Sequence, residues 1–193
     1  MLLCGMSGAG FVLVGGRSSR MGEPKARLRV ASRFLVEIVA RTVADAAGGV
    51  TLVGNPAFFA DLPFECLPDL RSGFGPLAGL EAVLASERAE FNLVVGCDMP
   101  DIRSTDLARL LSVAEQTGAL CTLAIDGGGR PHPLCAVYRR DSLPFVRAAL
   151  DAGRLRLLDV VKELQAVEVR IDSVLSNLNT PEQWAAWQAA QSV

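Results

Sequence analysis

Short apolar runs alternate with longer amphipathic stretches along this chain. Several runs have the length and composition of β-strands, at 11–14, 50–53, 64–67, 91–95, 120–125, 132–138 and 166–171. Apolar residues recur at helical spacing in the stretches between them, at 32–47, 77–86, 105–116, 142–152 and 156–164, and again after Pro181. Strands that alternate with helices predict an α/β fold, with a mostly parallel sheet and helices on both faces. The strand–turn–strand run at 120–138 predicts a small antiparallel element.

The length and composition of the chain indicate a single domain over residues 1–193. Half of the 193 residues are hydrophobic, enough for a sizeable core, and the net charge is −2. No block rich in Lys or Arg occurs, so a nucleic-acid partner is not expected. The apolar start lacks the basic residues of a signal peptide, and no apolar run approaches the length of a membrane span. We therefore expect a cytoplasmic protein without a membrane partner.

The cysteines are expected to be free thiols in a reducing compartment. Their number, five, is odd, and no C-x-x-C motif occurs. Cys97 adjoins a candidate functional residue, so a nucleophilic role competes there with a role as core filler. The chain has one histidine to activate such a thiol, which favours the core.

The first predicted strand ends in a glycine pair within a basic loop. Gly15 and Gly16 let the backbone approach a ligand closely, and exposed backbone N–H groups make such a loop an anion site. Arg17, Arg20 and Lys25 add positive charge, so a polyphosphate is the expected anion. The loop lacks the Ser or Thr that follows the lysine in the Walker pattern, and the third glycine of the dinucleotide-binding pattern.

Candidate carboxylates follow two other strands. Parallel strands bring their carboxyl ends to one edge of a sheet, so the loops that begin at Gly15, Asp69 and Asp98 are expected to gather in one crevice. Asp98 ends the most apolar strand, where a carboxylate facing a phosphate loop is well placed to hold Mg²⁺. The alternative is an aspartate that only fixes the turn before Pro100. The basic loop in the same chain favours the metal.

The sequence L-V-G-G-R-S-S-R-M-G-E-P-K over 13–25 resembles the signature of Rossmann-like nucleotidyltransferases. Further motifs resemble those of the molybdenum cofactor guanylyltransferases of the MobA family, namely G-P-L-A-G at 75–79, C-D-M-P at 97–100, R-P-H-P at 130–133 and N-L-N-T-P at 177–181. The resemblance covers nearly the whole chain. It implies a Rossmann-like nucleotidyltransferase fold and transfer of GMP from GTP to molybdopterin, with Mg²⁺ as cofactor and release of pyrophosphate.

The resemblance also implies roles for individual residues. The nucleotide-binding residues are expected to be Leu13, Val14, Gly15, Gly16, Lys25, Asp69 and Asp98. Lys25 and Arg20 are expected to stabilise charge on the phosphates, and Asp98 to hold Mg²⁺, which makes these three the expected catalytic residues. The acceptor phosphate is already anionic, so no strong general base is required.

Three residues are candidates for binding the acceptor. His132 lies in the R-P-H-P motif, but a role in a turn or in packing is an equal alternative. Asn177 and Asn179 lie in the N-L-N-T-P motif, which is also a capped helix N-terminus. In the helix that follows, Trp184 and Trp187 are expected to pack in the core.

The resemblance leaves two rival activities open. Gly15 stands where related cytidylyltransferases carry alanine, and the missing methyl group leaves more room beside the base, which favours a purine and therefore GTP. The branched side chain of Val14 occupies part of this room. The family usually has an asparagine where this chain has Val53, so that contact is not expected here. The rivals are another nucleotidyltransferase, using CTP with molybdopterin or an NTP with a sugar or polyol phosphate, and a nucleotide-binding regulator without turnover. We also expect transient contact with molybdoenzymes that receive the cofactor, and a monomer or weak homo-oligomer.

Overall fold

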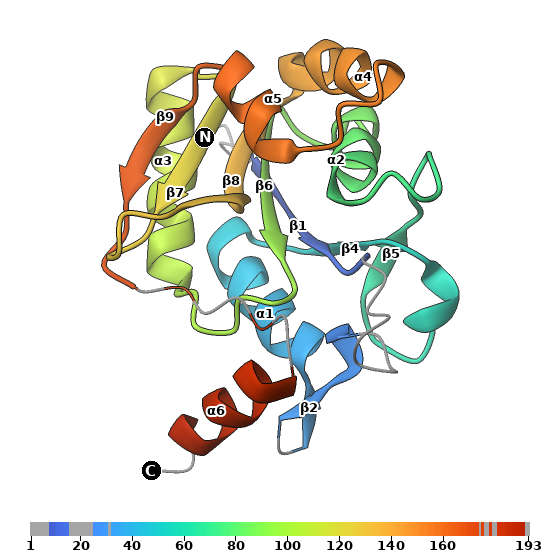
Figure 1. Ribbon diagram of the computed structural model, residues 1–193, viewed down its shortest axis with the longest axis vertical. Coiled ribbons are helices and arrows are strands. Elements are labelled where there is room, and N and C mark those ends of the chain that lie inside the picture. Colours follow the sequence, from blue (N-terminus) through green and yellow to red (C-terminus); the bar gives the residue numbers. More distant parts are fainter. Residues whose placement is uncertain are drawn as a thin grey trace, which may run out of the picture.

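The computed structural model describes residues 8–15, 25–30, 32–173, 175, 178 and 181–191, and a seven-stranded sheet runs through it (Figure 1). In spatial order the strands are β5 (Glu65–Leu67), β4 (Thr51–Val53), β1 (Gly8–Leu13), β6 (Phe91–Gly96), β8 (Pro131–Arg139), β7 (Cys121–Ile125) and β9 (Val167–Arg170). The helices are α1 (Leu35–Ala47), α2 (Pro76–Ala85), α3 (Ser104–Thr117), α4 (Leu143–Asp151), α5 (Leu157–Glu163) and α6 (Pro181–Gln191). The sheet is parallel except for β8, which runs antiparallel to both β6 and β7. This arrangement confirms the predicted α/β fold and its antiparallel element.

The order of the strands creates a switch point beside β1. The chain runs from β1 outward through β4 to β5, and then crosses back so that β6 pairs with the other side of β1. Phe11 of β1 lies between Thr51 of β4 and Val94 of β6 in this register. Open α/β sheets bind ligands at such a reversal, outside the carboxyl ends of the strands.

Both faces of the sheet are buried, which explains why the strands read as continuous apolar runs. Val12 and Leu52 are fully buried in a cluster with apolar residues of α1 and α3. Phe11 and Leu13 point to the other face and pack in a second cluster with residues of α2, α4 and α5. The two helical layers therefore hold β1 rigidly between them.

The residues before α1 form a hairpin that the sequence pattern did not indicate. Helix α1 was predicted over 32–47, but it begins at Leu35, because β2 (Arg29–Val30) and β3 (Arg33–Phe34) pair antiparallel just before it. The hairpin follows a short 3-10 helix, η1 (Lys25–Arg27). The Leu35 amide donates to the Leu28 carbonyl at 2.8 Å and joins the hairpin to the start of α1.

The tryptophans of α6 do not pack in the core, so that prediction was wrong. Trp184 and Trp187 stack on each other, with ring centroids 5.6 Å apart and planes 22° apart, and both remain partly exposed. Nε1 of Trp187 donates to Asp101 at 2.7 Å. Helix α6 lies apart from the sheet (Figure 1), so its rings meet each other instead of the buried clusters.

The four described cysteines are free, as predicted. Cys121 and Cys135 are fully buried, and burial raises the pKa of each thiol to about 12. Cys97 is 8% exposed and belongs to the cluster beneath α1 and α3, which favours the role of core filler. Cys4 lies outside the described residues.

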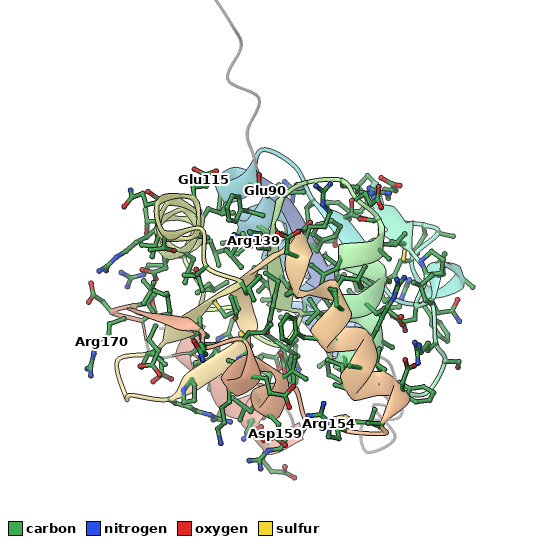
Figure 2. The ribbon with its side chains drawn as sticks, turned by 90° about the horizontal axis from the view of Figure 1, so that it is seen from above. Glu90, Glu115, Arg139, Arg154, Asp159 and Arg170 are labelled. Carbon is green, nitrogen blue, oxygen red and sulfur yellow. The ribbon has the colours of Figure 1, made fainter. Side chains whose placement is uncertain are left out.

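The amino-terminal end of the parallel strands has a structural role. In Figure 2, which looks onto this end, Glu90 and Glu115 lie near Arg139. Arg139, at the end of β8, donates to the Gly118 carbonyl that ends α3.

Within the described residues, no helix combines the length and the apolar character needed to cross a bilayer.

Candidate functional site

Backbone hydrogen bonds join the carboxyl ends of four strands at the switch point. The Val14 amide donates to the Val53 carbonyl at 2.9 Å, and the Cys97 amide donates to the Leu13 carbonyl at 3.2 Å. One strand further out, the Gly54 amide donates to the Leu67 carbonyl at 2.9 Å. These bonds continue the ladders past the strand ends, so the segments after β1, β4, β5 and β6 begin side by side. The loops that begin at Gly15, Asp69 and Asp98 therefore start at one edge of the sheet, as expected from the sequence.

Asp69 reaches back from the loop after β5 into the space between β1 and α2. A β-carbon at Gly15 would lie 3.7 Å from Oδ2 of Asp69, and one at Gly79 would lie 3.5 Å from Oδ1. The Gly79 position also lies 3.0 Å from Cδ2 of Leu13, so the absence of a side chain there lets α2 approach β1 closely. The carboxylate of Asp69 is thus placed beside the expected nucleotide loop.

Surrounding protein partly desolvates the Asp69 carboxylate and raises its pKa above the ordinary aspartate value, although the residue remains exposed. An ionised carboxylate only accepts hydrogen bonds, so donors on a bound ligand would stabilise its charged form. Asp69 is therefore suited to take hydrogen bonds from the base or the ribose of a nucleotide.

Asp98 folds back over the last residue of β6. A β-carbon at Gly96 would lie only 2.7 Å from Oδ1 of Asp98, a distance that β-carbons essentially never show. The glycine therefore makes room for this carboxylate at the edge of the sheet. Asp98 is half-buried, and its carbonyl accepts a hydrogen bond from the amide of Leu178 at 3.1 Å.

The bond to Leu178 brings a distant segment to the site. Leu178 is buried and lies between Asn177 and Asn179, the two asparagines expected to bind the acceptor. Both asparagines lie outside the described residues, so their role remains a prediction. The backbone contact places Leu178 against the Asp98 turn, 80 positions away in sequence.

The residues present fit a magnesium ion at Asp98. Among the described residues, no group of three or more His, Cys, Asp or Glu is arranged to hold a metal ion. Mg²⁺ does not need such a group, because it usually takes one or two carboxylates and completes its shell with phosphate oxygens and water. Asp98, half-buried at the carboxyl edge of the sheet, can supply one such carboxylate.

The basic loop is described only at its end. Gly16, Arg17 and Arg20 lie outside the described residues, and Lys25 begins η1. Arg27, in the same turn as Lys25, binds both oxygens of Asp61 at 2.7 and 2.8 Å. This guanidinium also holds the pKa of Asp61 below its ordinary value.

Packing supports the same turn from below. Ala26 is 1% exposed and belongs to the cluster beneath α1. The buried Ala26 therefore fixes the turn η1 on the core, and the Arg27–Asp61 pair, with Asp61 55% exposed, adds little to this.

Helix α2 begins at the same edge of the sheet. Gly75 precedes it with a φ of 64°, and Gly73 has a φ of 86°, both values that side chains disfavour. Pro76 occupies the first turn, which contains no acidic residue. Backbone N–H groups at such a helix start are donors for polar groups of a ligand.

His132 is buried and paired with a turn. It is 1% exposed, and its Nε2 lies 2.8 Å from Oδ2 of Asp126. The other oxygen of Asp126 accepts from the amides of Gly128 and Arg130, each at 2.9 Å. These contacts account for the turn and packing alternative, and contact with an acceptor remains a prediction.

Sequence reasoning missed two charged residues next to the site. Glu81 is the charged residue of α2, whose other residues are apolar or Gly and Pro, and its partner Arg71 follows Asp69 by two positions. The available signal was an acidic residue in the middle of an apolar helix.

The sequence matches the family of MobA-like NTP transferase domains over residues 10–183. A probable molybdenum cofactor guanylyltransferase of Chloroflexus aggregans is 32% identical, in a match that covers 94% of this chain and 93% of the relative. One from Flavobacterium johnsoniae is 27% identical, covering 90% and 92%. Among solved structures, the molybdopterin-guanine dinucleotide biosynthesis protein A of Archaeoglobus fulgidus has the same fold, with a TM-score of 0.81 at 23% identity over 95% of this chain and 98% of that one.

Proposed function

Because the chain belongs to the family of MobA-like NTP transferase domains, we propose that it transfers GMP from GTP to molybdopterin. An oxygen of the acceptor phosphate attacks the α-phosphorus of GTP, the bond from that phosphorus to the bridging oxygen breaks, and pyrophosphate leaves. The observation that supports the proposal is that Asp69 and Asp98 follow strands on either side of β1, at the carboxyl edge of the sheet beside the switch point. The names of the relatives from C. aggregans and F. johnsoniae support the same activity.

The chain contributes charge and position to this reaction, as phosphoryl transfer requires. Lys25 and Arg20 neutralise phosphate charge as it shifts toward the leaving pyrophosphate. Asp98 holds Mg²⁺, which when bound polarises the phosphates and stabilises the leaving group. Asp69 accepts hydrogen bonds from the nucleoside and thereby orients the α-phosphate. The acceptor is already an anion, so no side chain has to remove a proton from it.

Space beside Gly15 supports a purine as the base. A β-carbon there would make only ordinary contact with Asp69 among the described atoms, so packing against the protein does not explain the glycine. The open position leaves room for a ligand between the β1 loop and the start of α2. Backbone groups of Gly75 and Leu77 then face the donors of guanine, and each polar group that the wrong base leaves unpaired costs about 1–3 kcal/mol, roughly tenfold to a hundredfold in selectivity.

A pyrophosphate-release screen tests the proposal. GTP, CTP, ATP and UTP are each offered with molybdopterin and with common sugar phosphates, in the presence of Mg²⁺. We expect the highest kcat/KM for GTP with molybdopterin. Equal or better use of CTP would identify a cytidylyltransferase, turnover with a sugar phosphate alone would identify a different acceptor, and GTP binding without pyrophosphate would favour the regulator.

A further inference from the structure

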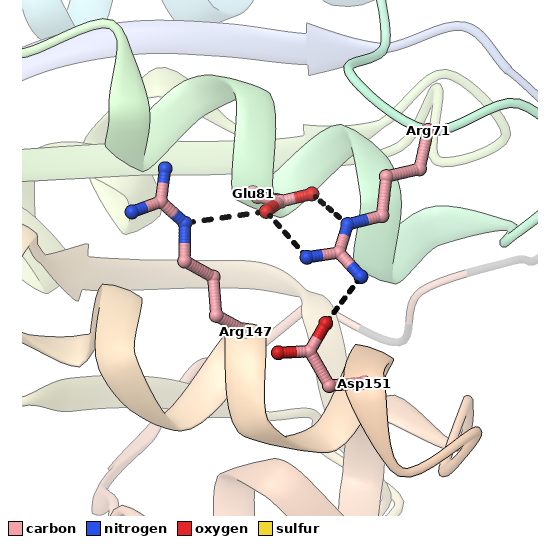
Figure 3. Close-up of polar contacts among 4 residues, drawn as sticks. All are labelled: Arg71, Glu81, Arg147 and Asp151. Carbon is pink, nitrogen blue, oxygen red and sulfur yellow. Dashed lines mark hydrogen bonds and ion pairs between the residues drawn. The ribbon is translucent and has the colours of Figure 1, made fainter.

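A carboxylate is buried in the helix that begins at the proposed nucleotide site. Glu81 is 3% exposed, and its neighbours along α2 are buried apolar residues. Two arginines from outside the helix reach it (Figure 3). Nε of Arg71 lies 2.9 Å from Oε2 and its Nη2 lies 3.3 Å from Oε1, while Nε of Arg147 on α4 lies 3.3 Å from Oε1.

The two arginines differ in how many contacts they make with Glu81 and in how exposed they are. Arg71 contacts both oxygens of Glu81 and also Asp151 at 2.6 Å, but Asp151 is 66% exposed, and such a surface pair contributes little. Arg147 contacts one oxygen and is itself 50% exposed. A buried carboxylate is costly unless paired, so Glu81 holds its partners strongly, and Arg71 most of all.

Arg71 belongs to the loop that carries Asp69. The loop between β5 and α2 holds Asp69 against the Gly79 position of α2, and two residues later Arg71 binds Glu81 on the same helix. Between these two contacts, Leu70 is 57% exposed and so adds little packing. Gly73 follows, with a φ of 86° that a side chain would disfavour. The Arg71–Glu81 pair is therefore the strong attachment of this loop to α2 among the contacts described.

We propose that the Arg71–Glu81 pair is a latch that positions Asp69 for nucleotide binding. This inference rests on the proposed function for the identity of the nucleotide. Arg71 and Glu81 are positioning residues, because both act through Asp69 and their charged groups are turned toward α4 (Figure 3). The buried carboxylate of Glu81 thereby holds Arg71, and through the loop it fixes the carboxylate of Asp69 at the edge of the sheet.

Kinetics of three variants separate positioning from simple neutralisation of Glu81. Arg71→Ala and Glu81→Gln both open the latch, and each is expected to raise the KM for GTP roughly tenfold with little change in kcat, since the lost contact binds ground state and transition state alike. The double variant is expected to match the single ones, because both substitutions break the same contact. Arg147→Ala is the matched control: it also removes an arginine from Glu81, but from α4, and it is expected to leave KM unchanged. An equal KM effect of Arg147→Ala, or additive effects of Arg71→Ala and Glu81→Gln, would overturn the latch.

The nucleotide-free protein provides an independent readout, in case Glu81→Gln does not fold. The pKa of Asp69 is measured by carboxyl ¹³C NMR, with the signal assigned by its loss in Asp69→Asn. In Arg71→Ala the released loop is expected to expose Asp69 and lower its raised pKa, whereas loss of a nearby positive charge alone acts in the opposite direction. An unchanged or higher pKa would refute the latch. A wild-type protein that makes no pyrophosphate from GTP would instead contradict the proposed function, and the titration would still decide the latch.

Discussion

Gly96→Ala tests whether the Asp98 carboxylate must lie where the structure places it. The added β-carbon would lie 2.7 Å from Oδ1 of Asp98, whereas its distances to Cβ and Cδ1 of Leu134, 3.4 and 3.5 Å, are ordinary contacts. The conflict is therefore with the end of one side chain and not with the backbone or the core. We expect the fold to persist and the carboxylate to move.

The size of the effect follows from that displacement. Oδ1 must shift by about 0.7 Å to restore a distance of 3.4 Å, and a displacement of about 1 Å at a reacting centre costs on the order of a hundredfold in rate. We therefore expect kcat/KM to fall roughly tenfold to a hundredfold, equivalent to about 1.4–2.7 kcal/mol. Alanine also stabilises a strand by about 0.5–1 kcal/mol relative to glycine, which offsets part of the strain.

The assay is pyrophosphate release from GTP and molybdopterin at several Mg²⁺ concentrations, together with thermal unfolding. Gly49→Ala is the control, because a β-carbon at Gly49 meets no atom within 4 Å, and it is expected to leave both activity and Tm unchanged. A kcat/KM for Gly96→Ala within about threefold of wild type would refute the reasoning. If Gly96→Ala also lowers Tm enough for unfolding to account for the lost activity, the reasoning is refuted as well.

Three further predictions concern single side chains. Asp98→Ala is expected to remove several kcal/mol of transition-state stabilisation while Tm changes little, and near-normal turnover would exclude Asp98 from the mechanism. Lys25→Ala is expected to lower kcat as well as GTP affinity, and a change confined to KM would make it a binding residue only. Asp126→Ala is expected to lower the free energy of unfolding by about 1–3 kcal/mol without changing the KM for GTP. The hydrogen bond from His132 is the main cause that lowers the pKa of Asp126, so this contribution to stability is present at neutral pH and is lost as the pH falls below 3.8. Chemical denaturation at several pH values measures the difference in unfolding free energy between wild type and Asp126→Ala. A difference that stays the same in acid would contradict the prediction.

Much of the fold could be predicted from the sequence because the signals are local. A strand buried on both faces is mostly apolar, as 91–95 is apart from the buried Asn92, and an amphipathic helix must repeat its apolar residues, as 35–47 does. The hairpin of β2 and β3 escaped prediction because each strand has two residues, too few to show a period. The tryptophan pair escaped it because spacing indicates a shared side of the helix but not what covers that side.

The candidate site was predictable where residue type and position in the strand pattern already indicate a role. Gly15, Asp69 and Asp98 each follow an apolar run, and parallel strands must bring those ends to one edge. Their order along the chain says nothing of how the side chains meet. The contacts of Asp69 with the Gly15 and Gly79 positions depend on how closely α2 packs on Leu13, which is a property of the assembled layers.

The sequence by itself determined the α/β class, the edge of the sheet at which the ligand loops gather, and the resemblance to nucleotidyltransferases. These follow from periodicity and from motifs, which are local properties of the chain. Only the tertiary structure decided that Gly96 makes room for Asp98, that Leu178 joins the Asp98 turn, and that Glu81 anchors Arg71. The reason is that each of these contacts depends on the distance between packed elements, and packing is decided by all the layers together.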